Sequence, residues 1–235
     1  MEGEAPAEPP VEEWDRTKRN DRIVTETIRH MPGGRLIGIT GGIACGKSEV
    51  GRILAEAGVD VQDSDAMAHE AIARGGPAYD EVIRRFGRTI VGPDEEIDRA
   101  ILGERVFADP AERAALNALV HPHVRRAWRT WADEVRASGR MGAVLIPLLF
   151  EVGAEKDVDE VWCVAASEDL VVTRLARRGL TEEQTRKRIA AQMPLKEKMR
   201  RADVVIENNG SLEELKEETL QKLQTILSKE IKEHG

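Results

Sequence analysis

Short apolar runs alternate with glycine-rich turns and helical stretches along this chain. Consecutive apolar residues are typical of strands that are buried on both faces, as in parallel sheets covered by helices. We therefore expect an α/β fold with a mainly parallel sheet. The five expected strands cover Leu36–Thr40, Val59–Gln62, Ala143–Leu149, Val161–Ala165 and Asp203–Glu207.

Helical periodicity fills most of the chain between those strands. A helix is expected from Lys47 to Ala57, directly after the first strand. Two more, Asp98–Phe107 and Ala111–Val135, fall in the long stretch between the second and third strands, which predicts an inserted helical subdomain. Capping residues predict later helix starts at Ser167, at the capping box Thr181–Gln184, and at Ser211.

Residues 1–34 differ in composition from the rest of the chain and predict an N-terminal extension. Residues 1–10 are rich in Glu, Pro and Ala, which is typical of disorder. Between Glu12 and Met31 a short amphipathic helix is an open alternative, because three apolar residues share one helical face: Val24, Ile28 and Met31. Gly33-Gly34 indicates a linker into the folded domain.

Composition narrows the class of protein further. The chain has 41% apolar and only 3% aromatic residues, so aliphatic side chains must fill its core. A net charge of −8 disfavours nucleic acid as a partner. The longest apolar run, Ala143–Phe150, is too short to cross a membrane. The two cysteines, Cys45 and Cys163, lie far apart without a metal-binding or redox pattern, so we expect a cytoplasmic protein.

The turn after the first expected strand carries the most specific motif. Residues 41–48 fit G-x-x-x-x-G-K-S between a strand and a helix, where backbone N–H groups and the helix N-terminus cradle phosphates. Lys47 is expected to reach the β- and γ-phosphates and Ser48 to bind Mg²⁺. The expected ATP-binding residues are Gly41, Gly42, Ile43, Ala44, Cys45, Gly46, Lys47, Ser48 and Glu49.

Other nucleotide-binding classes fit less well. The chain has neither the N-K-x-D motif that reads guanine nor a D-x-x-G switch, which argues against a GTPase. The third strand leads into Phe150-Glu151 rather than into the usual magnesium-binding Asp. We therefore expect Mg²⁺ to be held by Ser48, by water, and by Asp65 or Glu151.

Cys45 gives a separate hypothesis. A thiol beside Lys47 and a helix N-terminus is expected to have a lowered pKa, so that oxidation or alkylation would block ATP binding. The alternative is that Cys45 is a small residue tolerated in the loop.

Beyond the loop, further motifs resemble the dephospho-CoA kinase family. They occur in that family's order at Val61–His69, His121-Pro122, Pro147–Glu151, Arg174–Gln192 and Ala202–Ile206. The resemblance covers about Arg35 to Leu227. It implies a P-loop kinase fold, in which a five-stranded mainly parallel sheet flanked by helices carries a helical substrate-binding insert and a lid. The implied domain is 35–230, with core 35–62 and 141–227, a CoA-binding insert at about 66–138 and a lid at about 173–198.

The same resemblance implies a reaction. Such a kinase uses Mg²⁺ and ATP to phosphorylate the ribose 3′-hydroxyl of dephospho-CoA, the last step of CoA biosynthesis. Asp65 would orient the acceptor hydroxyl and take its proton, and Asp63 would contact the substrate. From the residues alone, both Asp63 and Asp65 equally fit a helix cap at a strand-to-helix junction.

The remaining implied site residues lie in the insert and the lid. His121 would contact dephospho-CoA, although a structural histidine beside a proline is the alternative. Arg177 is the expected transition-state contact, with Arg174 and Arg188 as supporting phosphate contacts. Any one of these arginines also fits a solvated surface role. Two positions depart from the family's pattern: Cys45, where a small hydroxyl residue is usual, and Arg178, where a polar or acidic residue is common.

Two rival functions remain open at this stage. One is a kinase for another small acceptor, such as a nucleoside monophosphate or shikimate, because these enzymes share the loop and the lid. The other is a regulator that binds ATP without turnover. The expected partners are ATP and dephospho-CoA, with no nucleic acid or membrane, in a monomer or weak homo-oligomer.

Overall fold

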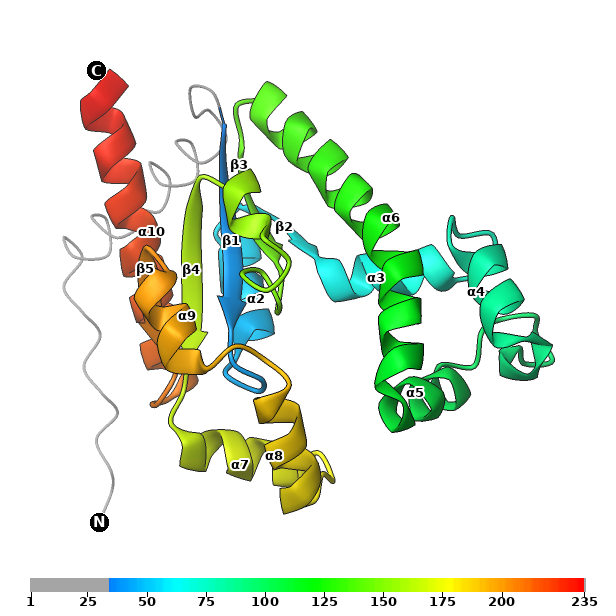
Figure 1. Cartoon of the computed structure of the whole chain (residues 1–235). Helices are drawn as coiled ribbons and strands as arrows, with labels where there is room; N and C mark the ends of the chain where they lie inside the picture. The colour runs from blue at the N-terminus through cyan, green and yellow to red at the C-terminus, as the bar shows by residue number, and fades with distance from the viewer. Residues whose placement is uncertain (1–33, 235) are drawn as a thin grey trace, which may run out of the picture.

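The structure is a computed structural model that describes residues 34–234, with side chains up to residue 229 (Figure 1). The predicted N-terminal extension and its alternative amphipathic helix lie outside the described residues, apart from Gly34. Within the described part of the chain, no helix is both long and apolar enough to cross a membrane.

A five-stranded sheet forms the centre of the molecule. Its strands are β1 (Arg35–Gly41), β2 (Asp60–Asp63), β3 (Met141–Leu145), β4 (Glu160–Ala165) and β5 (Val204–Glu207). Their order is β2-β3-β1-β4-β5, and every neighbouring pair is parallel. In the central register Gly38 lies opposite Val144 on one side and Val161 on the other. The predicted α/β fold with a parallel sheet is confirmed.

The third strand is shorter than the expected Ala143–Leu149, because it ends at Leu145. The Ile146 N–H still donates to the Ile39 carbonyl at 2.9 Å, but Pro147 has no N–H with which to continue the ladder. The chain then turns through residues 147–153. This turn brings the Pro147 carbonyl and Glu151 beside the C-terminal end of the sheet.

The helices form three groups. Those of the core are α2 (Lys47–Glu56), α9 (Leu195–Arg201) and α10 (Leu212–His234). Those between β2 and β3 are α3 (Ser64–Ile72), α4 (Tyr79–Phe86), α5 (Arg99–Ala108) and α6 (Pro110–Ala137), with the 3₁₀ turn Arg88–Ile90. After β4 come α7 (Glu168–Arg177) and α8 (Glu182–Ala190), and the short 3₁₀ helix Ala154–Asp157 precedes β4. The capping box of Thr181 and Gln184 is present as predicted.

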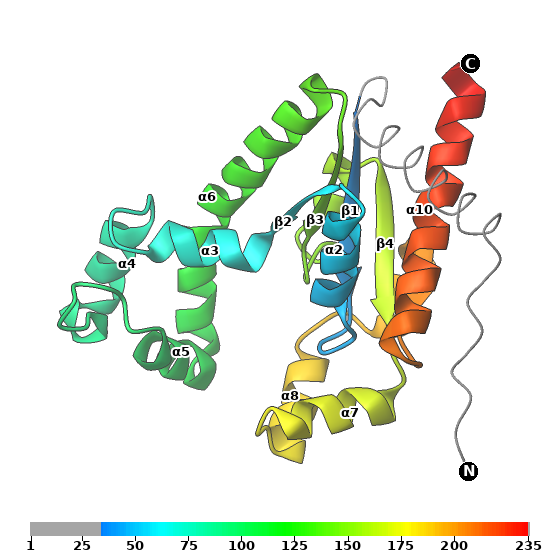
Figure 2. The ribbon, with the colours of Figure 1, turned by 180° about the vertical axis from the view of Figure 1, so that it is seen from behind.

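Two apolar cores cover the two faces of the sheet, and α2 and α10 lie side by side over one of these faces (Figure 2). Ile37 and Ile39 of β1 point into the first core, which includes Leu54 of α2 and Leu223 of α10. Leu36, one residue earlier, belongs to the second core, which also contains Trp128 of α6. This alternation buries both faces of the central strands, so β1, β3 and β4 are mainly apolar. The edge strand β2, in contrast, is mostly polar and only half-buried.

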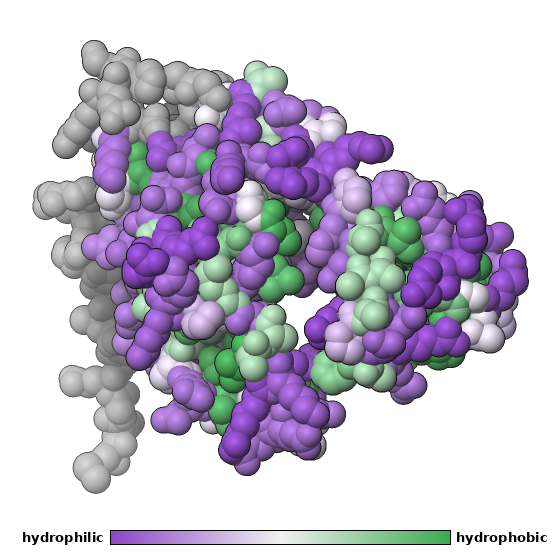
Figure 3. All heavy atoms as spheres, in the orientation of Figure 1, coloured by the Kyte–Doolittle hydropathy of each residue, from purple (hydrophilic) through white to green (hydrophobic). Residues whose placement is uncertain are grey.

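The helices α3–α6 form a lobe that stands away from the sheet (Figure 1). α6 joins the lobe to the core, because its C-terminal part packs on β1 and β3. Pro122 lies inside this helix, where it removes one backbone hydrogen bond. The loop after β1 lies at the end of the sheet, between this lobe and the pair α7–α8, and the space-filling view shows a gap between core and lobe (Figure 3).

We expect Leu54→Ala to destabilise the protein by about 2–5 kcal/mol, because the side chain is 0% exposed and its loss leaves a cavity. The matched control is Leu212→Ala, at a leucine that is 60% exposed, where the change should stay within about 0.5 kcal/mol. Urea unfolding followed by circular dichroism measures both. Equal unfolding midpoints for the two variants would contradict the assignment of Leu54 to the core.

Candidate active site

The loop between β1 and α2 has a shape that only glycine permits at two positions. Gly41 has φ 148°, and a Cβ there would lie 2.1 Å from the Val164 carbonyl oxygen of β4. Gly46 has φ 106°, and a Cβ there would lie 2.2 Å from Nδ2 of Asn208. Both contacts are closer than any real Cβ makes. The two glycines of the motif therefore fix how closely the loop lies to its neighbours.

Asn208 and Arg174 brace the loop from behind. Asn208 Nδ2 donates to the Cys45 carbonyl at 2.8 Å, and its side chain is 6% exposed. Arg174 Nη1 donates to the Ala44 carbonyl at 3.2 Å, while Nη2 donates to Asn208 Oδ1 at 3.2 Å. Sequence reasoning missed Asn208, whose one signal is its place directly after the last strand. Arg174 was expected to contact phosphate. In the structure its guanidinium donates instead to the Ala44 carbonyl of the loop and to the carbonyl oxygens of Asn208.

The start of α2 offers donors to an anion. Gly46 is its N-cap and supplies no side-chain acceptor to the first turn. Lys47 Nζ donates to the Gly42 carbonyl at 2.8 Å and to Gly41 at 3.3 Å, so the ammonium lies on the loop. Burial lowers the pKa of Lys47 from its usual value. Ser48 is exposed beside it, and the Glu49 carboxylate accepts a hydrogen bond from Arg52 at 3.1 Å.

Asp65 stands in the first turn of α3, where β2 ends. Its N–H donates to Oδ1 of Asp63 at 2.8 Å, so Asp63 is the helix cap. Although Asp65 keeps contact with solvent, desolvation and then the Asp63 charge raise the pKa of its carboxyl, against the attraction of Lys47 and His69. The Asp65 charge in turn acts on Lys47, where it favours a higher pKa and so opposes the effect of burial. Lys47 and Asp65, from elements on either side of β3, are thus close enough for each charge to act on the pKa of the other group.

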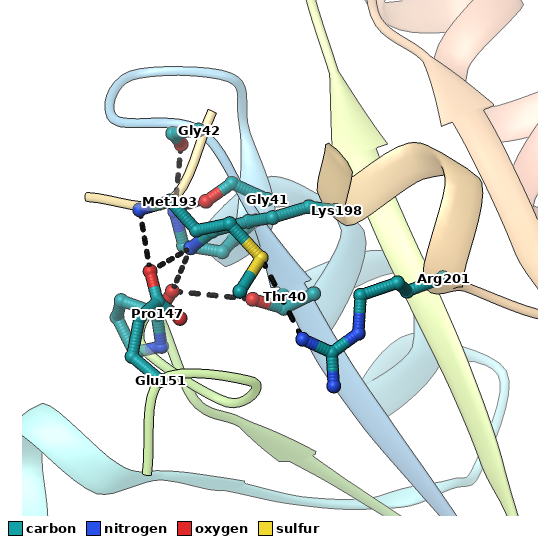
Figure 4. Close-up of polar contacts among 9 residues, drawn as sticks. Thr40, Gly41, Gly42, Pro147, Glu151, Met193, Lys198 and Arg201 are labelled. Atoms are coloured by element: carbon teal, nitrogen blue, oxygen red, sulfur yellow. Dashed lines mark hydrogen bonds and ion pairs between the residues drawn. The ribbon is translucent and has the colours of Figure 1, made fainter. Parts of the chain in front are cut away.

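A lysine that the sequence did not single out lies next to the loop (Figure 4). Lys198 of α9 is 0% exposed, and its Nζ donates to the Pro147 carbonyl at 2.6 Å. The same Nζ lies 3.0 Å from Glu151 Oε1, which also accepts the Met193 N–H at 2.9 Å. Glu151, one of the expected metal ligands, is therefore bound by two protein donors. Nothing in the sequence indicated a role for Lys198, because lysines in helices are normally solvated.

The other predicted residues lie on the insert and on α7–α8. Arg177 is exposed at the C-terminal end of α7. Arg188 of α8 lies over the ring of Phe107 in α5, with its guanidinium carbon 5.4 Å from the ring centroid. His121 is exposed on α6, and desolvation lowers the pKa of its imidazole. The Arg188–Phe107 contact joins α8 to the insert.

The hypothesis of a reactive Cys45 thiol is wrong in its physical premise. Cys45 is fully buried. Burial raises the pKa of its thiol and outweighs the opposing effects of Lys47 and nearby backbone N–H groups. The protonated thiol is a poor nucleophile, so the alternative of a small buried residue fits the structure.

A magnesium ion would find few protein ligands here. Within residues 34–234, no cluster of three His, Cys, Asp or Glu side chains could hold a metal. The Ser48 hydroxyl at the start of α2 and the Asp65 carboxylate remain as oxygen ligands. This donor set fits Mg²⁺ that arrives on phosphates and keeps much of its water.

Comparison with known proteins gives a consistent result. A family model described as dephospho-CoA kinase matches residues 35–214. The chain is 48% identical over 182 residues to a dephospho-CoA kinase of Symbiobacterium thermophilum, covering 76% of each chain. It is 46% identical over 196 residues to that of Carboxydothermus hydrogenoformans, covering 83% of this chain and 93% of the relative.

Solved structures agree with the sequence comparison. The protein TT1252 from Thermus thermophilus is similar with a TM-score of 0.69 and 41% identity, over 84% of this chain and 98% of that one. A dephospho-CoA kinase from Campylobacter jejuni is similar with a TM-score of 0.65 and 26% identity, over 83% of this chain and 98% of that one. The resemblance found in the sequence motifs is confirmed.

We expect Cys45 in the native protein to resist alkylation. With a buried thiol of raised pKa, iodoacetamide at pH 8 should label it on the order of 100-fold more slowly than in the urea-unfolded chain. Mass spectrometry of the labelled peptides gives both rates. Cys163 is an internal control, because burial raises its pKa to about 11 and it should be protected equally. Similar rates in the native and unfolded protein would contradict the buried assignment.

Proposed function

Because the chain belongs to the dephospho-CoA kinase family, whose members catalyse the final step of CoA biosynthesis, we propose that it transfers the γ-phosphoryl group of ATP to the ribose 3′-hydroxyl of dephospho-CoA. The acceptor oxygen forms a bond to the γ-phosphorus, the bond to the ADP oxygen breaks, and the acceptor proton leaves. The observation that carries this proposal is the glycine-shaped loop that ends at the uncapped start of α2 with Lys47, while Asp65 in the first turn of α3 is close enough for its charge to act on Lys47.

The phosphate side of the reaction is assigned to residues 41–49. Backbone N–H groups of the loop and of the first turn of α2 bind the phosphate oxygens, since no side chain caps that helix. Lys47 then moves from the Gly41 and Gly42 carbonyls to the β- and γ-phosphates. Arg174 and Asn208 hold the loop from behind, which keeps those N–H groups pointing at the nucleotide.

The acceptor side is assigned to Asp65. Its carboxylate orients the 3′-hydroxyl and takes the proton as the new bond forms. The raised pKa suits this role, because a base accepts a proton better when its pKa is nearer to the working pH. Asp63 holds the first turn of α3 in place through its bond to the Asp65 N–H, and so fixes the carboxylate's position.

Magnesium would be held by Ser48 and by the nucleotide phosphates, with Asp65 in reach through water. When bound, Mg²⁺ neutralises charge on the β- and γ-phosphates and makes ADP a better leaving group. Glu151 is not assigned as a ligand, because Lys198 and the Met193 N–H already occupy Oε1 of its carboxylate.

The insert and the lid are assigned to substrate binding. The insert of about residues 66–138 holds dephospho-CoA, with His121 as one contact. In the lid of about residues 173–198, Arg177 approaches the transferring phosphoryl group, because the side chain is exposed about one helical turn after Arg174, which contacts the loop. Arg188 supports it after leaving Phe107. We expect a monomer or weak homo-oligomer.

A coupled ADP-release assay tests the proposal. With Mg²⁺ and ATP we expect turnover with dephospho-CoA, a product of the mass of CoA, and at most traces of turnover with AMP, shikimate or no acceptor. Lys47→Ala is the control and should lose at least about 100-fold in rate, because it removes the cation that faces the transferring phosphate. ATP binding without turnover on any acceptor would favour a regulator instead.

The pH profile tests the role of Asp65. As a base, Asp65 must be ionised, so kcat/KM should fall as the pH drops through its raised pKa. Asp63→Asn keeps an oxygen for the Asp65 N–H but removes the charge that raises this pKa, so the acid limb should move to lower pH. Asp65→Asn should lose about 10²–10⁴-fold in kcat together with the limb. An acid limb that stays in place in Asp63→Asn would show that another group titrates.

A further inference from the structure

A fully buried lysine is unusual enough to need an explanation. Lys198 is 0% exposed, although a desolvated ammonium is costly unless other groups compensate for it. Its two acceptors are the Pro147 carbonyl at 2.6 Å and Glu151 Oε1 at 3.0 Å, and both belong to the turn after β3. Lys198 itself comes from α9, the helix in which the proposed lid of about residues 173–198 ends. The Lys198 ammonium therefore joins α9 to the turn after β3, two segments that are far apart in sequence.

We propose that Lys198 and Glu151 form a buried hinge that positions the lid relative to the phosphate loop. Lys198 is a positioning residue, since it acts through Glu151 and the Met193 N–H and not by touching substrate. The proposal rests on the function proposed above. It adds that the Lys198–Glu151 contact holds the lid arginines in position relative to the phosphate loop.

The contacts of Glu151 place the hinge at one point of the chain. Met193 lies between the end of α8 at Ala190 and the start of α9 at Leu195, and its N–H donates to Glu151 at 2.9 Å. Figure 4 shows Lys198 and Met193 converging on the Glu151 carboxylate. The last residues of the lid segment are thus tied to the turn after β3.

The segment after the hinge is anchored separately. Arg201, at the end of α9, forms an ion pair with Glu155 at 2.9 Å and lies over the Phe150 ring, 4.4 Å from its centroid. α9 also packs on β1 and β4. With α9 fixed to the core, a movement of α8 would have to turn on residues 190–195, and the Met193 N–H holds this stretch to Glu151.

The hinge also reaches the phosphate loop. Thr40 Oγ1 donates to the Pro147 carbonyl at 3.1 Å, so this oxygen accepts from both Lys198 and the residue before Gly41. The charge of Lys198 is close enough to Lys47 to lower the pKa of the loop lysine further. A displacement of Lys198 would therefore change the contacts of the lid and of the phosphate loop at the same time.

The experiment compares Lys198→Met, Glu151→Gln and the double variant, with Lys196→Met as the control at an exposed lysine of the same helix. We expect each single variant to lower kcat about 10–100-fold while KM for ATP changes less than about threefold, because misplaced lid arginines affect the transition state more than binding. The double variant should be no slower than either single one, since it leaves no unpaired buried charge. Lys198→Arg should restore part of the rate, and Lys196→Met should match the wild type.

Amide hydrogen exchange gives a second result that does not depend on turnover. Opening of the hinge should speed exchange at residues 191–197 about tenfold in Lys198→Met and in Glu151→Gln, and leave it unchanged in Lys196→Met. If Lys198→Met does not fold, the nearly isosteric Glu151→Gln carries the test alone. Additive losses in the double variant, raised KM with unchanged kcat, or unchanged exchange would each overturn the proposal. Failure of the wild type to phosphorylate dephospho-CoA would overturn the proposed function, and the exchange data would still decide the hinge.

Discussion

The close packing of two glycines of the phosphate loop against neighbouring segments is the constraint on which the site depends. Gly41 lies against the Val164 carbonyl and Gly46 against the Asn208 side chain, and neither place has room for a Cβ. The loop therefore cannot be shifted without moving β4 or the segment after β5. Because β1 is the middle strand of the sheet, its end is the best-fixed point of the fold, and the nucleotide site is built there.

Burial and neighbouring charges together shift the pKa values of the ionisable groups around the phosphate loop. Lys47 and Lys198 are both withdrawn from water. Glu151 from the turn after β3 pairs with Lys198, and the charge of Asp65 from α3 acts on Lys47 from a distance. Burial alone would raise the pKa of Glu151, but the Met193 N–H and the Lys198 ammonium outweigh it and lower that pKa. The pKa of Asp65 moves the other way. Two carboxylates near one loop thus have opposite tendencies, one suited to fixed charge and one to proton transfer.

Much of the fold could be predicted because its signals are local. The apolar runs identified the strands, the glycine pattern identified the loop, and the capping box identified α8. The end of β3 was placed too late, since the apolar run continues through Ile146 and Leu148-Leu149 while the sheet has already ended before Pro147. Lys198 and Asn208 were missed because their importance depends on contacts with segments far away in sequence, at Glu151 and Cys45. Cys45 was misjudged because burial, which the sequence does not state, outweighs the neighbouring charge.

The contact between Arg188 and Phe107 turns three separate segments into a ring. Core, insert and lid border the gap seen in Figure 3, and this stacking closes its rim between α8 and α5. A long, thin molecule inside such a ring is encircled, so it must thread out end first unless the ring opens. Phe107 is 51% exposed, and a cation–π contact at an exposed site is worth only about 0.5–1 kcal/mol. Thermal motion breaks a contact of that strength readily, so the ring can open at this point without the unfolding of any helix.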